Sequence, residues 1–231
     1  MSDAPHTDQA YGDILRLEPL LASAHVHEGS PERMFFLVTH QACELWFALV
    51  LGHLDAAARA LRDDEADAAA GWLERLPSVV RVLVAQFDAL TTLAPADFEG
   101  IRTALGSASG IQSAQFREIE YACGLRDTRA LSTRGFSEAE RDRLRRRLTE
   151  QSVADAYERL VKRRGHADAG VIRVRAALLD FDEAFVVWRA RHAGLAERFL
   201  GGRRGTGGSE GPAYLWRAAG KRLFPDVWGA A

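Results

Sequence analysis

Residues 181–199 read Phe181-Asp-Glu-Ala-Phe185-Val-Val-Trp188-Arg-Ala-Arg-His192-Ala-Gly-Leu195-Ala-Glu-Arg-Phe199. The large apolar side chains of this stretch recur every three or four residues, which is the spacing of one face of an α-helix. His192 lies on the same face, between Trp188 and Leu195. The stretch therefore predicts a long amphipathic helix that carries a histidine into the protein interior.

An imidazole inside a protein needs a partner, because burial of an unsatisfied polar group is costly. The partner is a carbonyl, a carboxylate or a metal, and a core histidine that bonds a backbone acceptor is the commoner case. After the helix, residues 205–211 read Gly-Thr-Gly-Gly-Ser-Glu-Gly. Glycines let the backbone of such a loop approach a ligand closely. A buried histidine followed by this loop indicates a cofactor site with a substrate entrance.

The composition limits the classes of function. The chain has 231 residues, of which 47% are hydrophobic, and its 30 basic and 32 acidic residues give a net charge of −2. This balance gives no reason to expect a nucleic acid or an anionic membrane as partner. The two cysteines, Cys43 and Cys123, do not form a zinc or iron–sulfur motif. With no secretion leader in the first ten residues and no uninterrupted apolar run of membrane-spanning length, we expect a cytoplasmic protein.

Helical periodicity runs through nearly the whole chain, and strand-like alternation is scarce. Ser30-Pro31 opens a helix that is predicted to end near Leu61, and a capping box at residues 137–140 opens another. Further helices are predicted at residues 11–21, 66–90 with a break at Pro77, 112–123, 152–164, 168–200 and 213–223, and a turn at residues 94–97. We therefore predict one all-α domain over residues 1–231, with residues 1–10 disordered.

A second histidine lies on an apolar helical face. Phe36, His40, Cys43 and Phe47 recur at helical spacing after Pro31. Two buried histidines on separate long helices are typical of a haem pocket, with one as axial ligand and the other on the opposite side. The alternative is that His40 forms a hydrogen bond within the helix packing, and the spacing alone leaves both interpretations open.

Several blocks of the sequence, in the right order, resemble the tryptophan 2,3-dioxygenase family. The first is Met34-Phe-Phe-Leu-Val-Thr-His-Gln-Ala-Cys-Glu-Leu-Trp-Phe47, and the second is Asp97-Phe-Glu-Gly-Ile-Arg102 continuing to Arg117. The third is Trp188-Arg-Ala-Arg-His192, followed at the family's spacing by residues 205–209. The match extends from about residue 11 to residue 224, and an ordered set of blocks is far more specific than any single motif.

The resemblance implies a helical fold, a haem b cofactor and a role for each matching residue. His192 would be the axial ligand of the haem iron, and His40 the catalytic residue that bonds the indole N–H on the other side. The remaining assignments are Phe36 and Phe98 against the indole ring, Arg102 and Thr206 on the substrate carboxylate, Ser109 and Gly110 near dioxygen and the ammonium group, and Tyr11 and Leu15 in the site of a neighbouring subunit.

The family's reaction is the cleavage of the indole C2–C3 bond of L-tryptophan by dioxygen, which gives N-formylkynurenine. The resemblance also implies a homo-oligomer, a tetramer or a dimer, in which residues 11–29 contact a neighbour. The chain departs from the family by a shortened region at 165–181, by Ile14, where some members carry a pocket tyrosine, and by Cys43, where tyrosine or serine is common. Two alternatives follow: a haem enzyme that acts on a substituted tryptophan or inserts one oxygen to give a 2-oxindole, and a non-catalytic haem- or tryptophan-binding protein.

Overall fold

The computed structural model describes residues 10–25, 30–206 and 210–229, and the regular structure in these ranges is entirely helical, as predicted. The expectation for residues 1–10 falls, apart from Ala10, outside the described residues. The α-helices are α1 (Tyr11–Ile14), α2 (Leu17–His25), α3 (Pro31–Arg62), α4 (Ala66–Leu73), α5 (Leu76–Leu90), α6 (Pro95–Leu105), α7 (Ala114–Cys123), α8 (Glu138–Thr149), α9 (Val153–Arg164), α10 (Ala169–Leu200), α11 (Pro212–Ala219) and α12 (Pro225–Gly229). Two short 3₁₀ helices, η1 (Gly110–Gln112) and η2 (Thr128–Ser132), lie in the connections.

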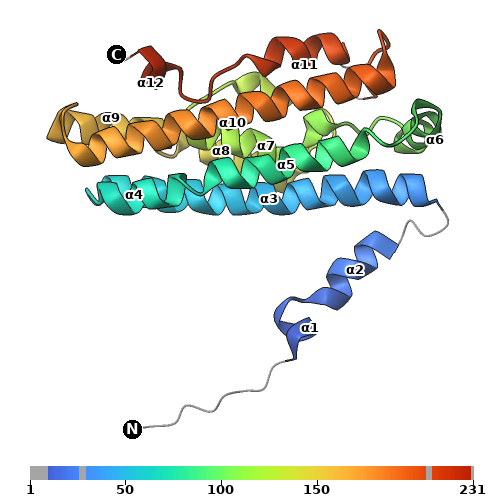
Figure 1. Cartoon of the computed structure of the whole chain (residues 1–231), viewed down its shortest axis with the longest axis horizontal. Coiled ribbons are helices and arrows are strands. Elements are labelled where there is room, and N and C mark those ends of the chain that lie inside the picture. The colour runs from blue at the N-terminus through green and yellow to red at the C-terminus, as the bar shows by residue number, and fades with distance from the viewer. Residues whose placement is uncertain (1–9, 26–29, 207–209, 230–231) are drawn as a thin grey trace.

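Two helices of 32 residues, α3 and α10, form the frame of the bundle. Pro31 stands in the first turn of α3, where its missing N–H costs nothing. Asp168 caps α10 by accepting a hydrogen bond from the Val171 N–H. Helices α4 and α5 run between the two long helices, α11 lies on the far side of α10, and α7 and α9 also pack on α3 (Figure 1).

The core follows the predicted apolar face of α10. Phe181 and Phe185 are completely buried, and Trp188, Leu195 and Phe199 are nearly so. Burial of each such side chain contributes about 1.5–3 kcal/mol, so this face holds α10 firmly against the bundle. His192 lies on the same face but is only partly buried, because it opens onto a cavity.

Three predicted boundaries were wrong. Residues 95–105 form a helix, α6, where only a turn was predicted, because Pro95 is the first helical residue and not a turn residue. The break before α5 lies at residues 74–75, and Pro77 sits in the first turn of α5. The helix after residue 212 ends at Ala219, and the chain continues to a further short helix, α12.

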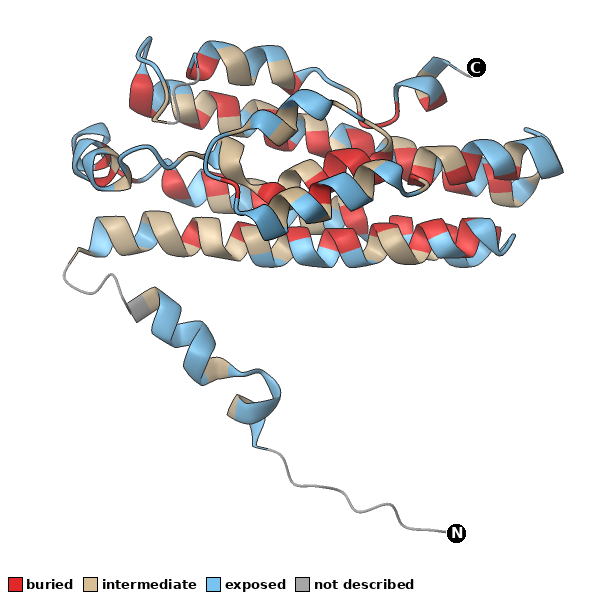
Figure 2. Cartoon of the chain, turned by 180° about the vertical axis from the view of Figure 1, so that it is seen from behind, coloured by how far each residue is buried: buried red, intermediate tan, exposed pale blue. Residues whose placement is uncertain are grey.

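The predicted helix over residues 11–21 is divided into α1 and α2, because Arg16 adopts a left-handed conformation with φ of 51°. Both helices lie apart from the bundle, and most of their residues are exposed (Figures 1 and 2). A hydrogen bond from Gln41 Nε2 to the Ser23 carbonyl, at 3.3 Å, ties α2 to α3. Tyr11 is 73% exposed and Ile14 63%, so this chain alone leaves apolar side chains of α1 uncovered.

Among the described helices, α3 has the length and apolar composition of a membrane-spanning helix. Residues 66–90 and 95–105, which meet at a sharp bend, also reach that length and composition if the two segments are taken together as one span. These features are weak indicators, because core helices of soluble bundles share them. Since α3 packs against α4, α5, α7 and α9, we interpret it as a bundle helix.

Candidate functional site

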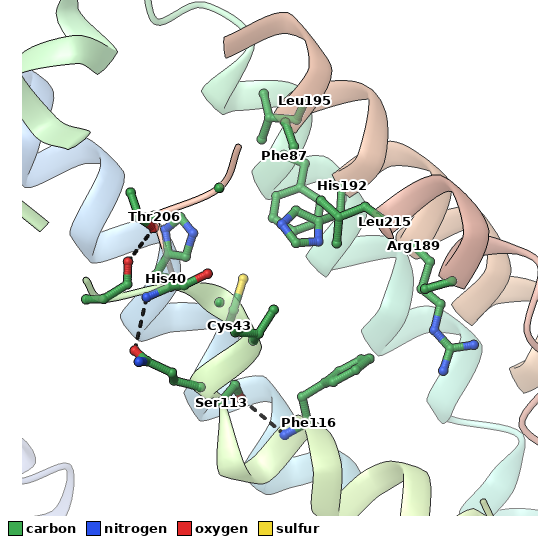
Figure 3. A pocket seen from close by; sticks show the side chains of 18 of the residues that line it. His40, Cys43, Phe87, Ser113, Phe116, Arg189, His192, Leu195, Thr206 and Leu215 are labelled. Carbon is green, nitrogen blue, oxygen red and sulfur yellow. Dashed lines mark hydrogen bonds between the residues drawn. The ribbon is translucent and has the colours of Figure 1, made fainter. Parts of the chain in front are cut away.

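A cavity of about 530 Å³ lies between α3, α5, α7, α10 and α11, and its volume is within the range of small-molecule and cofactor sites. Figure 3 shows it from close by, with His40 on one side and His192 on the other. The sequence-predicted residues that line it are Phe36, His40, Phe98, Ser109, Gly110, Thr206 and His192. The tertiary structure thus brings both histidines to one cavity.

His192 projects from α10 between aromatic rings. Its ring stacks on Phe87, with centroids 5.2 Å apart, and on Trp188 at 5.8 Å. It makes no hydrogen bond to any described residue. His192 is therefore not a core histidine bonded to a backbone carbonyl within the described part of the chain. Burial, with a smaller contribution from His40, lowers the pKa of His192 to about 4. The imidazole is therefore neutral at pH 7, which is the form that ligates metals.

His40 projects from α3 and is held by its own helix. Its Nδ1–H donates to the Phe36 carbonyl at 2.7 Å. This bond sets the tautomer in which Nε2 carries a free lone pair. Burial lowers the pKa of His40, so the ring is neutral and can accept a hydrogen bond from a ligand N–H.

An aromatic wall adjoins His40. The Phe36 ring lies 4.2 Å from the His40 ring and 5.7 Å from Phe98, which stacks on Phe199 at 4.7 Å. Phe98 is contributed by α6, the helix that the sequence interpretation missed. This side of the cavity is suited to a planar aromatic ligand.

Gly205, Thr206 and Gly211, the described residues of the glycine-rich stretch that contact the cavity, line one side of it. Thr206 Oγ1 donates to the Ala108 carbonyl at 2.5 Å, which ties the loop to the segment that carries Ser109 and Gly110. Gly211 has φ of +70°, and a Cβ there would lie 2.5 Å from the Arg203 carbonyl oxygen, so only glycine fits at this position.

Three predicted site residues do not line the cavity. Arg102 Nη2 donates to the carbonyl of Arg204 at 3.1 Å, which places its guanidinium beside the loop and not on the cavity wall. Tyr11 and Leu15 lie in or next to α1 and are exposed. Their predicted role concerns a second copy of the chain and stays a prediction.

Sequence reasoning missed much of the wall opposite the loop. The cavity is also lined by Phe87, Phe116, Arg117, Glu120 and Arg189. Of these contacts, the sequence gives a local indication only of the ion pair between Arg117 and Glu120, which lie three residues apart on α7. Cys43, noted on the His40 face, also lines the cavity, and its thiol donates to Gln86 Oε1 at 3.1 Å.

The residues present fit a planar cofactor that carries its own metal. Among the described residues, no group of three or more histidine, cysteine or acidic side chains could hold a metal ion, so a metal here needs other ligands. A haem supplies four of them and takes a neutral histidine as the axial ligand. The buried Trp188 Nε1 also lacks a hydrogen-bond partner within the described part of the chain, which leaves a donor for a bound group. Fold and site together are those of an all-α protein with a cavity whose lining fits a planar cofactor and a histidine to hold it.

Comparisons with known proteins give the family. The chain matches the sequence profile of the family described as tryptophan 2,3-dioxygenase, over residues 1–170 and 143–231. It is 36% identical to the tryptophan 2,3-dioxygenase of Nocardioides sp., over 95% of this chain and 92% of the relative. For that of Bacillus thuringiensis subsp. konkukian the identity is 32% over 99% and 95%, and for that of Burkholderia pseudomallei 31% over 95% and 82%.

The chain belongs to the tryptophan 2,3-dioxygenase family. The family predicted from the sequence is confirmed, and with it the prediction of an oxidoreductase with an all-α fold.

Proposed function

We propose that this protein is a haem-dependent dioxygenase that opens the indole ring of L-tryptophan to give N-formylkynurenine. The observation that carries the proposal is the pair of neutral histidines that face one cavity from α3 and α10, with the His192 ring unpartnered among the described residues and His40 fixed in one tautomer. Membership of the tryptophan 2,3-dioxygenase family supports the same reaction.

His192 would hold the cofactor, haem b, through its iron. The stack of Phe87 and Trp188 fixes the plane of its ring, so little side-chain freedom is lost when the imidazole binds a metal. When bound, the haem supplies an iron that activates dioxygen. The surrounding aromatic side chains exclude water from the reacting groups.

His40 would position the substrate. Its Nε2 accepts a hydrogen bond from the indole N–H, while Phe36 and Phe98 pack on the ring. Because the indole N–H is a very weak acid, the task of His40 is to orient the ring and not to remove its proton. Orientation of this kind converts binding energy into rate.

Arg102 would hold the substrate carboxylate. Its guanidinium bonds the Arg204 carbonyl, two residues before Thr206. A carboxylate is the stronger acceptor for a guanidinium, so it would replace that carbonyl, with Thr206 as a second donor. Ser109 and Gly110, which follow the Ala108 carbonyl that Thr206 bonds, would lie near the ammonium group and dioxygen.

The site would be completed by a second copy of the chain. Tyr11 and Leu15 are exposed apolar residues at the end of an arm with few contacts to its own bundle. We expect a dimer or tetramer in which this arm covers a neighbour's cavity. A chain without residues 1–29 would then be smaller by light scattering and would bind tryptophan weakly. The proposed location is the cytoplasm, where the buried free thiols Cys43 and Cys123 stay reduced.

The test is the product formed by the reduced, haem-loaded protein from L-tryptophan and ¹⁸O-labelled dioxygen. Mass spectrometry should find N-formylkynurenine with both labelled atoms. A 2-oxindole with one labelled atom would support the single-oxygen alternative instead. Haem binding with no product from tryptophan or ring-substituted tryptophans would leave a non-catalytic binding protein.

A further inference from the structure

Two arginines line the cavity wall beside Phe116, with their guanidinium carbons 5.4 Å and 5.7 Å from the centroid of its ring. Arg117 comes from α7 and Arg189 from α10, and their side chains are only 15% and 5% exposed. Both pair with the same carboxylate: Arg117 Nη1 lies 2.6 Å from Glu120 Oε2, and Arg189 Nη2 lies 3.2 Å from Glu120 Oε1. Two guanidinium groups thus share one carboxylate, and the cluster carries an excess positive charge.

The other acidic side chains nearby have partners of their own. Glu118 pairs with Arg143 on α8, and Glu44 accepts a hydrogen bond from Gln115 Nε2. Asp182, on the same helix as Arg189, accepts from two backbone N–H groups and from the Trp228 indole. None of these carboxylates makes an ion pair with Arg117 or Arg189, so the excess charge is not cancelled by a direct partner within the described residues.

The cluster keeps donors for a further acceptor. Arg117 Nε is buried without a hydrogen-bond partner among the described residues, and Arg117 Nη2 reaches the Tyr214 hydroxyl at a long 3.4 Å. Burial lowers the pKa of Arg189, whereas for Arg117 the effect of burial is outweighed by Glu120 and Tyr214 together, which raise the pKa. The Glu120 carboxylate lies closer to Arg117, at 2.6 Å, than to Arg189, at 3.2 Å.

The position of the cluster relates it to His192. Arg189 precedes His192 by three residues on α10, and side chains at this spacing lie on neighbouring parts of one helix face, about 5–6 Å apart at Cβ. Both side chains line the same cavity: in Figure 3 the His192 ring points toward His40, and the Arg189 side chain extends from the same helix toward the level of Phe116. A planar cofactor ligated at its centre by His192 would extend its edge toward Arg189 and Arg117.

We propose that Arg117 and Arg189 form an anion subsite of the cavity that binds the carboxylate groups at the edge of the haem, with the Tyr214 hydroxyl as an additional donor. The inference rests on the proposed function, because it assigns the edge of the cofactor whose iron His192 would hold. Guanidinium groups suit carboxylates, since two N–H donors match two oxygens. A bound carboxylate also supplies the negative charge that the buried cluster lacks.

The test compares haem with haem dimethyl ester, in which both carboxylates are masked. The full chain, freed of haem, is titrated with each compound, and binding is followed by quenching of tryptophan fluorescence and by the Soret band. We expect the wild type to bind haem at least about tenfold more tightly than the ester, the factor for one charge-assisted hydrogen bond. Arg117→Met should lose about tenfold in affinity for haem and none for the ester, and Arg117→Lys should recover part of the loss.

A matched control is Arg143→Met, which removes an arginine that also pairs with a glutamate on α7 but does not line the cavity. It should keep the wild-type preference for haem. Tyr214→Phe removes only a hydroxyl and should lower the preference for haem over the ester by a smaller factor. This variant keeps the proposal testable if Arg117→Met does not fold.

Equal affinity of the wild type for haem and ester, or equal losses for both in Arg117→Met, would overturn the subsite. Failure of the wild type to bind either compound would overturn the haem proposal itself.

Discussion

Removal of the Asp182 carboxylate is predicted to destabilise the fold by several kcal/mol. Asp182 lies in α10 and is fully buried, and it accepts hydrogen bonds from Leu223 N at 2.8 Å, Phe224 N at 3.3 Å and Trp228 Nε1 at 2.8 Å. These bonds attach the C-terminal segment, next to the part of α11 that lines the cavity, to the helix that carries His192. The carboxylate thus connects the end of the chain to the site.

The magnitude follows from the donors that Asp182→Ala leaves behind. A buried donor without a partner costs about 1–3 kcal/mol, and the N–H groups of Leu223 and Phe224 belong to buried residues, whereas Trp228 is partly exposed to water. Relief from burying a charge offsets part of this cost. We expect a loss of about 2–4 kcal/mol, which for a chain of this size lowers Tm by roughly 5–15 °C.

The assay is urea denaturation followed by circular dichroism, on the wild type, Asp182→Ala and Asp182→Asn. The asparagine variant keeps one acceptor oxygen and should lose about half as much. Asp180→Ala is the matched control, since Asp180 is exposed on the same helix and should change stability by less than about 0.5 kcal/mol. A loss below about 1 kcal/mol in Asp182→Ala would refute the view that this carboxylate holds the C-terminal segment.

Three further predictions concern the substrate clamp, a cavity thiol and pH. Arg102→Ala should raise the KM for L-tryptophan about 10- to 150-fold with an unchanged Soret band, because a charge-assisted bond contributes about 1.5–3 kcal/mol; an unchanged KM would remove Arg102 from the site. Burial raises the pKa of the Cys43 thiol to about 12, so iodoacetamide at pH 8 should leave this thiol unmodified in the folded protein. If mass spectrometry shows that Cys43 is alkylated as fast as in the unfolded chain, its burial is contradicted. Hydrogen bonds from Arg129 lower the pKa of Asp127 to about 2, against about 3.9 in an unfolded chain. The stabilisation is therefore present above about pH 4 and lost as the pH falls toward 2, and the difference in unfolding free energy between wild type and Asp127→Asn should shrink over that range; a constant difference would be inconsistent with the ion pair.

The helices were predictable where their signals are local. The apolar face from Phe181 to Phe199, the helix start at Ser30-Pro31 and the capping box at residues 137–140 depend on neighbours in sequence, and the structure reproduces them. Helix α6 was missed because residues 94–97 were interpreted as a turn, whereas Pro95 is the first residue of the helix. Its Phe98 makes a contact distant in sequence, the stacking on Phe199. Local patterns do not report such contacts.

The site could be predicted only in part for the same reason. Helical spacing placed His40 and His192 each on an apolar face, but spacing does not show that two faces meet, and the family resemblance supplied that step. The pairing of Arg189 with Glu120 joins residues 69 positions apart and has no local signature. The bond from Arg102 to the Arg204 carbonyl was likewise invisible, because a backbone acceptor leaves no trace in sequence.

The central claim is that His192 holds the iron of a haem in this cavity. The most direct measurement is the haem content and absorption spectrum of His192→Gly, with and without added imidazole. We predict that the variant loses the wild-type Soret band and retains little haem, and that imidazole, which can occupy the space left by the side chain, restores both. A variant that binds stoichiometric haem with an unchanged spectrum and without imidazole would contradict the assignment.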